Sequence, residues 1–181
     1  ATCGESRNHY NHQATPNDFM GPALWSSDLD VFAKYDPTGL GSHLDMLHCS
    51  PLCMGIAHEA ENVYWAFGGM SRTCTATRCT TTPQMGTSSI VKYDFGDDDG
   101  VGNDDHSDGT ALQYATGQVK YVENVPSHLR FDPSDGMLYI ADTGNARIAK
   151  LDTASGTPGR NLQPMEPMVM YKIVNDAVVT D

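Results

Sequence analysis

The histidines are the residues of this chain best suited to a metal site, because neutral imidazole is the commonest metal ligand in proteins. Seven histidines occur among 181 residues. His9 and His12 lie in a polar N-terminal segment, and we interpret them as solvent-facing. Zinc or copper suits nitrogen ligands, whereas the alternative is that each ring is a hydrogen-bonded structural residue. The candidate metal ligands are His48, His58, His106 and His128.

An acidic, glycine-rich run at 97–109 is a second candidate metal site. Clustered carboxylates beside tight turns suit a hard cation such as calcium, and the candidate ligands are Asp104, Asp105 and Asp108. The run lacks the spacing of an EF-hand loop. A solvated loop without a cation is the open alternative.

Five cysteines indicate an oxidising compartment. The chain begins Ala-Thr-Cys, without an initiator Met or a hydrophobic signal segment, which is typical of a secreted or periplasmic protein after processing. We expect two local disulfides, with free thiols as the alternative. Cys3 would then be free or joined to another chain. The disulfide candidates are Cys49, Cys53, Cys74 and Cys79.

The charge balance excludes several partners. Lys and Arg total 11 and Asp and Glu total 23, so the formal net charge is −12. Such a chain repels a nucleic-acid backbone and an anionic membrane surface. No apolar run is long enough for a membrane helix. The usual motifs of serine hydrolases, dinucleotide-binding proteins and P-loop proteins are absent.

A repeat indicates which elements would position the histidines. Lys34, Lys92 and Lys150 lie 58 residues apart, and each sits in a strand-like run that ends in Asp. Further strand-like runs at 62–67 and 137–142 precede the last two. Short β-rich units that recur at such a period predict an all-β fold, with the blades of a β-propeller as its type.

The segment 125–152 resembles an NHL repeat. It reads Pro126-Ser127-His128-Leu129-Arg130-Phe131-Asp132, then a Gly turn, then Ala141-Asp142-Thr143-Gly144-Asn145-Ala146-Arg147-Ile148. The segment 51–95 is similar, but its Ala-Asp is replaced and an insertion carries two cysteines. In such repeats the Asp caps a turn and the Arg packs against the neighbouring blade, so the resemblance implies structural roles for Asp142, Asn145 and Arg147.

The resemblance also implies a chemistry. NHL propellers include the peptidyl-hydroxyglycine amidating lyases, which hold zinc with histidines from the inner strands of several blades. His58 and His128 would then converge near the axis. The motif at 125–128 is similar to the lyases' Pro-His motif with its His displaced by one residue, which reverses the facing of the side chain. Tyr64 and Arg130 are the catalytic candidates that the resemblance offers.

The length predicts an incomplete ring. Propellers need about four to eight blades, and this chain supplies about three. A second polypeptide could therefore complete the propeller, which would make a hetero-oligomer. We expect an N-terminal arm or outer strand at 1–30 and NHL-like blades over 31–181. These divide into a partial blade at 31–50, a blade with the Cys insertion at 51–96, an acidic loop and strand at 97–123, an NHL blade at 124–156 and the start of another blade at 157–181.

Two functions remain open on the sequence. The first is a secreted, metal-dependent enzyme, lyase-like, that acts on a small molecule or a peptide end through a metal-bound water or the metal itself. The second is a non-catalytic propeller scaffold that binds a protein or a glycan.

Overall fold

A computed structural model gives the arrangement of most of the chain. It describes residues 1–2, 22–32, 42–47, 50, 52–69, 88–98, 100–102, 108–162, 170–175 and 178–181, with the backbone alone for 157–162 and 170–175. These ranges contain β-strands and one short 3-10 turn, so the predicted all-β class is confirmed. Within them no helix has the length and hydropathy of a transmembrane span.

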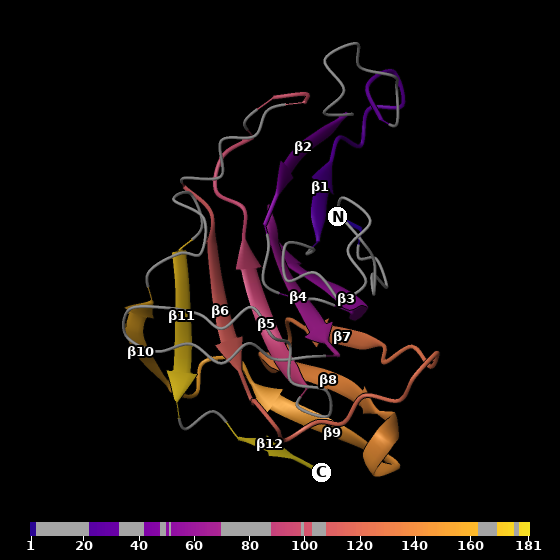
Figure 1. Cartoon of the computed structure of the whole chain (residues 1–181), viewed down its shortest axis with the longest axis vertical. Coiled ribbons are helices and arrows are strands. Elements are labelled where there is room, and N and C mark those ends of the chain that lie inside the picture. The colour runs from indigo at the N-terminus through magenta and orange to yellow at the C-terminus, as the bar shows by residue number, and fades with distance from the viewer. Residues whose placement is uncertain are drawn as a thin grey trace, which may run out of the picture.

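The described strands form three separate sheets, none of them closed into a barrel (Figure 1). The N-terminal pair contains β1 (Ala23–Trp25) and β2 (His43–Met46). The central sheet has the order β10-β11-β6-β5-β4-β3, and the C-terminal sheet has the order β12-β9-β8-β7. All pairings are antiparallel except that of β11 with β6.

Two of the sheets contain the same four-stranded antiparallel arrangement. In the central sheet it comprises β3 (Cys53–Ala60), β4 (Val63–Gly68), β5 (Ser89–Asp94) and β6 (Thr110–Tyr114). In the C-terminal sheet it comprises β7 (Leu129–Asp132), β8 (Met137–Asp142), β9 (Arg147–Asp152) and β12 (Val179–Thr180). The remaining elements are β10 (Thr157–Leu162), β11 (Met170–Asn175) and the 3-10 turn η2 (Thr143–Asn145). The segment 157–181 thus supplies strands to both sheets.

The 58-residue repeat marks equivalent places in these two sheets. Lys92 lies on β5 opposite Trp65, and Lys150 lies on β9 opposite Tyr139. Both strands end in an Asp whose carboxylate accepts a hydrogen bond from the backbone N–H two residues later. Trp65 and Tyr139 are therefore structurally equivalent positions.

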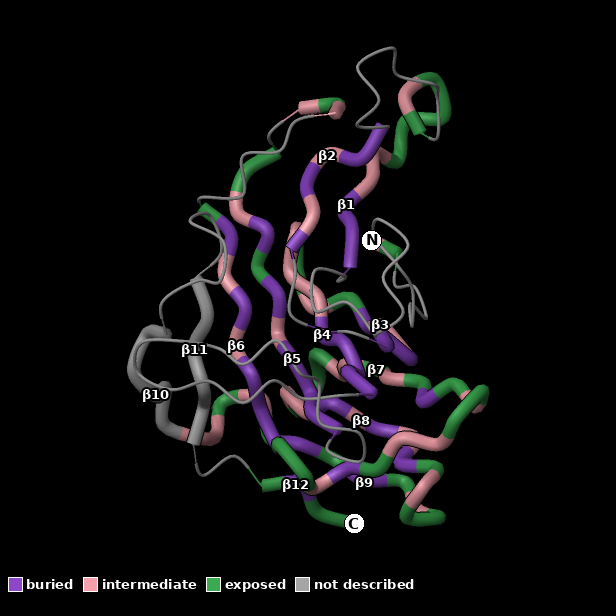
Figure 2. Tube along the Cα trace, viewed as in Figure 1, coloured by how far each residue is buried: buried purple, intermediate pink, exposed green. Residues whose placement is uncertain are grey.

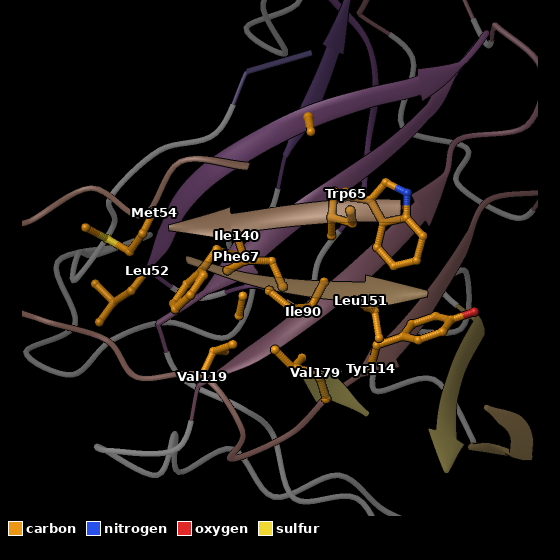
Figure 3. Close-up of a cluster of buried hydrophobic side chains, with 14 residues drawn as sticks. Leu52, Met54, Trp65, Phe67, Ile90, Tyr114, Val119, Ile140, Leu151 and Val179 are labelled. Carbon is orange, nitrogen blue, oxygen red and sulfur yellow. The ribbon is translucent and has the colours of Figure 1, made fainter. Parts of the chain in front are cut away.

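Hydrophobic cores lie on both faces of the β3–β6 part of the central sheet. Figure 2 shows that much of β4 and β5 is buried. One face packs on the N-terminal pair through a core that includes Leu24, Leu47 and Tyr93. The other face packs on the C-terminal sheet through Trp65, Phe67 and Ile90 of the central sheet (Figure 3). The C-terminal sheet contributes the aliphatic side chains Leu138, Ile140, Ala149, Leu151 and Val179. The three sheets therefore follow one another as layers, with the central sheet in the middle.

The backbone of β3 in the central sheet lies very close to the segment that leads into β7 of the C-terminal sheet. The N–H of Ser127 donates to the carbonyl of Met54 at 3.0 Å. A Cβ atom added to Gly55 would lie only 2.0 Å from the carbonyl oxygen of Ser127. Gly55 is thus required here because any side chain would separate the two sheets.

Asp142, Asn145 and Arg147 form a structural clamp. The buried carboxylate of Asp142 accepts from Arg147 Nε and Asn145 Nδ2, both at 2.8 Å, and from the N–H of Lys120 at 2.8 Å. Arg147 also donates to the carbonyl of Gln118 at 2.9 Å. Since residues 118–120 follow the central sheet, the clamp ties the C-terminal sheet to its predecessor.

Candidate functional site

An open groove of ≈ 370 Å³ lies beside the N-terminal pair and the β3–β4 hairpin. We call it the aromatic groove. Its volume falls in the lower part of the range for small-ligand sites. The lining residues are Leu24, Trp25, Ser26, Ser27, Leu44, His58, Glu61, Asn62, Tyr64 and Asp98.

The β3–β4 hairpin fixes one wall of the groove. Its two-residue turn is Glu61-Asn62, and Asn62 has a φ of 57°, the left-handed conformation that asparagine tolerates in tight hairpins. Asn62 Nδ2 donates to the carbonyl of Gly96 at 2.9 Å, and the N–H of Phe95 donates to the carbonyl of Asn62 at 3.0 Å. These bonds hold the segment that leads to Asp98 beside the turn.

Aromatic rings supply most of the apolar surface of the groove. His58 and Tyr64 lie opposite each other on β3 and β4, with ring centroids 5.3 Å apart in an edge-on arrangement. Tyr64 in turn meets Phe95 edge-on at 6.0 Å. Such pairs favour fixed ring orientations. The wall on β3–β4 is therefore a preorganised aromatic surface.

Trp25 forms the opposite wall. Its strand has a register irregularity between Leu24 and Trp25. The indole N–H donates to Thr2 Oγ1 at 2.7 Å, and the ring lies edge-on to Phe32 and His43 at 5.7 and 6.2 Å. The indole is thus oriented by a hydrogen bond and by two neighbouring rings.

The polar groups of the groove favour an uncharged or cationic ligand. Its described lining carries the carboxylates of Glu61 and Asp98 and no Lys or Arg. Burial raises the pKa of Tyr64 above its usual value, so its phenol remains a hydrogen-bond donor throughout the neutral range. With serine hydroxyls and an amide in the same lining, the groove can both donate and accept hydrogen bonds.

The predicted metal ligands are placed as follows. His48 and His106 lie outside the described residues, whereas His58 and His128 are both exposed. His58 lines the aromatic groove, and His128 lines a second hollow of ≈ 380 Å³ with residues 53–56 of β3. No group of three or more His, Cys, Asp or Glu side chains suited to a metal occurs among the residues with a described placement.

Strand pairing explains why these two histidines lie apart. His58 pairs with Tyr64 as Phe131 pairs with Leu138, so His58 and Phe131 are equivalent. His128 is therefore three positions away from the equivalent of His58. His58 lies on β3 of the central sheet, and His128 directly precedes the first strand of the C-terminal sheet.

The calcium candidates are described only in part. Asp104 and Asp105 lie outside the described residues. Asp108 lies where the acidic run closes on itself, and its Oδ2 accepts from the N–H of Asp97 at 2.7 Å. A Cβ atom added to Gly96 would lie 2.2 Å from the same oxygen. Asp108 thus has a loop-closing role in the structure.

Of the disulfide candidates, Cys49, Cys74 and Cys79 lie outside the described residues. Cys53 is buried at the start of β3. It is disulfide-bonded, and the other sulfur is outside the described residues, so the pairing of Cys49 with Cys53 stays a prediction.

The two catalytic candidates are not brought together. Tyr64 is half-buried in the aromatic groove and packs against the core beneath the N-terminal pair. Arg130 is exposed on β7 of the C-terminal sheet, at the position equivalent to Ala57. Tyr64 and Arg130 therefore face different surroundings.

Residue types and spacing did not indicate Trp25, Asn62 or Asp98 as site residues. The one local signal is the Glu61-Asn62 pair between two strand-like runs, which is typical of a tight hairpin turn. The meeting of Trp25 with this turn depends on contacts between sheets that no local pattern records.

Comparisons of the chain with protein-family models, with curated proteins and with solved structures give no match. A proposal about function must therefore be based on the geometry of the described residues.

Proposed function

We propose that this chain is a non-catalytic, NHL-like propeller scaffold that binds a neutral carbohydrate in the aromatic groove. The scaffold part is supported by the order of the sheets. Equivalent positions of the central and C-terminal sheets face the same way, and each sheet packs one face on its predecessor. Stacking of this kind is how the blades of a propeller cover their faces.

One observation supports a carbohydrate ligand. Trp25, His58 and Tyr64 line the same groove as two carboxylates, two serine hydroxyls and an amide. A sugar ring has an apolar face that fits an aromatic side chain and hydroxyl groups that both donate and accept hydrogen bonds. The carboxylates of Glu61 and Asp98 would accept from those hydroxyls. They would repel an acidic sugar, so a neutral saccharide fits best.

Binding of neutral oligosaccharides, measured by calorimetry and by NMR titration, tests this proposal. Trp25→Ala removes the largest ring, and we expect it to weaken binding by roughly tenfold or more, since aromatic residues dominate such sites. Tyr64→Phe keeps the ring and should lose only the hydrogen bond of the phenol, about two- to tenfold in affinity. Tyr139→Ala removes an aromatic ring outside the groove and is the matched control, with unchanged affinity expected.

Three results would overturn the proposal. One is the absence of saturable binding across a panel of neutral oligosaccharides. Another is binding that Trp25→Ala leaves unchanged. The third is a clear preference for a basic peptide over saccharides, which would assign the carboxylates and rings of the groove to a cationic partner.

The metal-dependent activity that the sequence suggests stays a prediction. Elemental analysis of the native protein checks it. Stoichiometric zinc or copper that is lost in both His58→Ala and His128→Ala would favour the enzyme over the scaffold.

A further inference from the structure

β3 is the end strand of the central sheet, so one of its edges has no pairing strand among the described residues. β7 is the end strand of the C-terminal sheet in the same way. Figure 1 shows the two strands beside each other, and the N–H of Ser127 joins them by donating to the carbonyl of Met54. An open edge presents backbone donors and acceptors that can pair with a further strand.

The hydrogen bonds of β4 show which backbone groups of β3 face this open edge. The N–H of Phe95 donates to the carbonyl of Asn62, just beyond the last pair of the β4–β5 ladder. Because hydrogen bonding alternates along an antiparallel strand, Trp65 then bonds to β3, where its partner is Ala57. The residues on either side of Ala57 must point their N–H and C=O groups away from β4. These residues are Ile56 and His58.

The start of β3 agrees with this assignment. The pairing with β4 is irregular between Cys53 and Gly55, and the carbonyl of Met54 faces the open edge, where it accepts from Ser127. Backbone groups two residues apart on a strand face the same way, so those of Ile56 follow Met54. Among the described residues no backbone group outside the sheet bonds to Ile56 or His58. The open edge thus offers two consecutive outward-facing residues.

The second hollow, of ≈ 380 Å³, lies beside this edge. Met54, Ile56 and Pro126 give it apolar surface, and Asn124 and His128 add groups that can hydrogen-bond. Its described lining contains no Asp, Glu, Lys or Arg. A charged side chain would lose its hydration there without gaining an ionic partner. The hollow is therefore suited to an uncharged, mainly apolar side chain.

We propose that the open edge of β3 binds an extended peptide of a partner protein as an added strand, with an apolar side chain of the peptide in the hollow. The backbone groups of Ile56 and His58 pair with the main chain of the peptide, and the hollow selects the side chain. A peptide fits this site because its amides repeat at the spacing of the edge groups. The inference does not depend on the carbohydrate that we propose for the aromatic groove.

NMR titration of the whole chain with capped six-residue peptides tests this proposal. The peptides alternate threonine with leucine, valine or phenylalanine, so they are uncharged and favour an extended backbone. We expect saturable binding that shifts the amide signals of Ile56 and His58 and slows their hydrogen exchange. Absence of saturable binding, or binding that leaves both amides unchanged, would overturn the proposal.

Peptides with alternate backbone amides methylated test the pairing itself. Two sets are needed, because either the odd or the even amides face β3. One set loses the donors that face the strand and should bind roughly tenfold more weakly or worse, while the other set keeps them. Equal affinity of the two sets and the unmethylated peptides would show that the main chain is not recognised and would contradict the added strand.

A proline on the open edge tests the same pairing from the side of the protein. Ile56→Pro removes an N–H that β4 does not use, so the sheet should tolerate it. We expect peptide affinity to fall roughly tenfold or more, because the donor is lost and the ring obstructs the edge. Ile56→Val keeps the N–H and is the matched control. Far-UV circular dichroism checks folding, and the methylated peptides replace this test if the proline variant is unfolded.

Further outcomes separate this site from the aromatic groove and from self-association. Trp25→Ala should weaken carbohydrate binding and leave peptide affinity unchanged, and equal loss of both would place the peptide in the groove and refute the inference. Slowed exchange at Ile56 and His58 with a doubled mass and no peptide binding would assign the edge to a second copy and also refute it. Absence of peptide binding with carbohydrate binding retained would refute this inference alone.

Discussion

Ile90 and Ile148 occupy the same position in two sheets of the same molecule and have opposite surroundings. Ile90 lies under a neighbouring sheet and is fully buried, whereas Ile148 points away from the stack. Trp65 and Tyr139 differ in the same sense, as do Phe67 and Ala141. Burial in this molecule is therefore set by whether another sheet follows, and the residue types have adapted to that difference.

The largest expected effect on stability is at the equivalent aromatic residues Trp65 and Tyr139. Trp65 is fully buried between the central and C-terminal sheets and contacts Tyr114 edge-on at 5.0 Å. Trp65→Ala should cost about 3–5 kcal/mol in the free energy of unfolding, because it leaves a large cavity. Tyr139→Ala at the equivalent, half-buried position should cost less, about 1 kcal/mol. Urea unfolding of both variants measures the difference, and equal losses would break the comparison.

The second largest effect on stability is expected at the clamp formed by Asp142, Asn145 and Arg147. Arg147→Ala removes the cation that neutralises the buried carboxylate of Asp142. We expect a loss of about 2–4 kcal/mol, somewhat below that for a fully buried pair, because Arg147 is partly exposed. Arg130→Ala, at an exposed position of β7, is the control, with a change of about 0.5 kcal/mol or less. Thermal unfolding of the two variants decides whether the clamp joins the sheets.

A smaller effect is expected from pH. Burial and, second, the nearby charge of Glu59 raise the pKa of Tyr114 above its usual value. The folded protein then holds this proton more tightly than the unfolded chain does. Stability from Tyr114 is thus complete below about pH 10, the unfolded value, and falls as the pH rises through the folded pKa. Alkaline titration of stability should show a shallower fall for Tyr114→Phe than for the parent protein.

Tyr139, on β8 of the C-terminal sheet, is the control for the pH experiment. Its hydrogen bond to Asp135, at 2.9 Å, raises its pKa, but the group is exposed. Tyr139→Phe should therefore leave the alkaline profile close to that of the parent. A profile that changes more for Tyr139→Phe than for Tyr114→Phe would contradict the difference in burial between the two tyrosines.

Local pattern in the sequence predicted much of the strand order. The runs around Lys92 and Lys150 are both third strands, and the β-rich composition gave the all-β class. Asp142 and Arg147 were expected to be structural residues, and in the structure they form an ion pair. These features are local, so residue periodicity and turn chemistry were enough to find them.

Register and long-range contacts could not be predicted in the same way. The pairing of β3 with β4 shifts register between Cys53 and Gly55 and again between His58 and Ala60. A simple alignment of the two first strands, which sets Pro51 beside Pro126, therefore misplaces His58 relative to His128. The aromatic groove was missed for a related reason, because Trp25 and Asn62 meet only when two sheets pack. The register depends on pairing between strands of one sheet, and the groove depends on contacts between two sheets.

A matched pair of aliphatic truncations tests the central claim, that equivalent sheets stack in one direction, most directly. We expect Ile90→Ala to lower the free energy of unfolding by about 2–5 kcal/mol and Ile148→Ala by about 0.5 kcal/mol or less. Urea unfolding should be measured at low protein concentration, where association contributes least to stability. A large loss for Ile90→Ala with almost none for Ile148→Ala supports the stack, and similar losses for the two variants would contradict it.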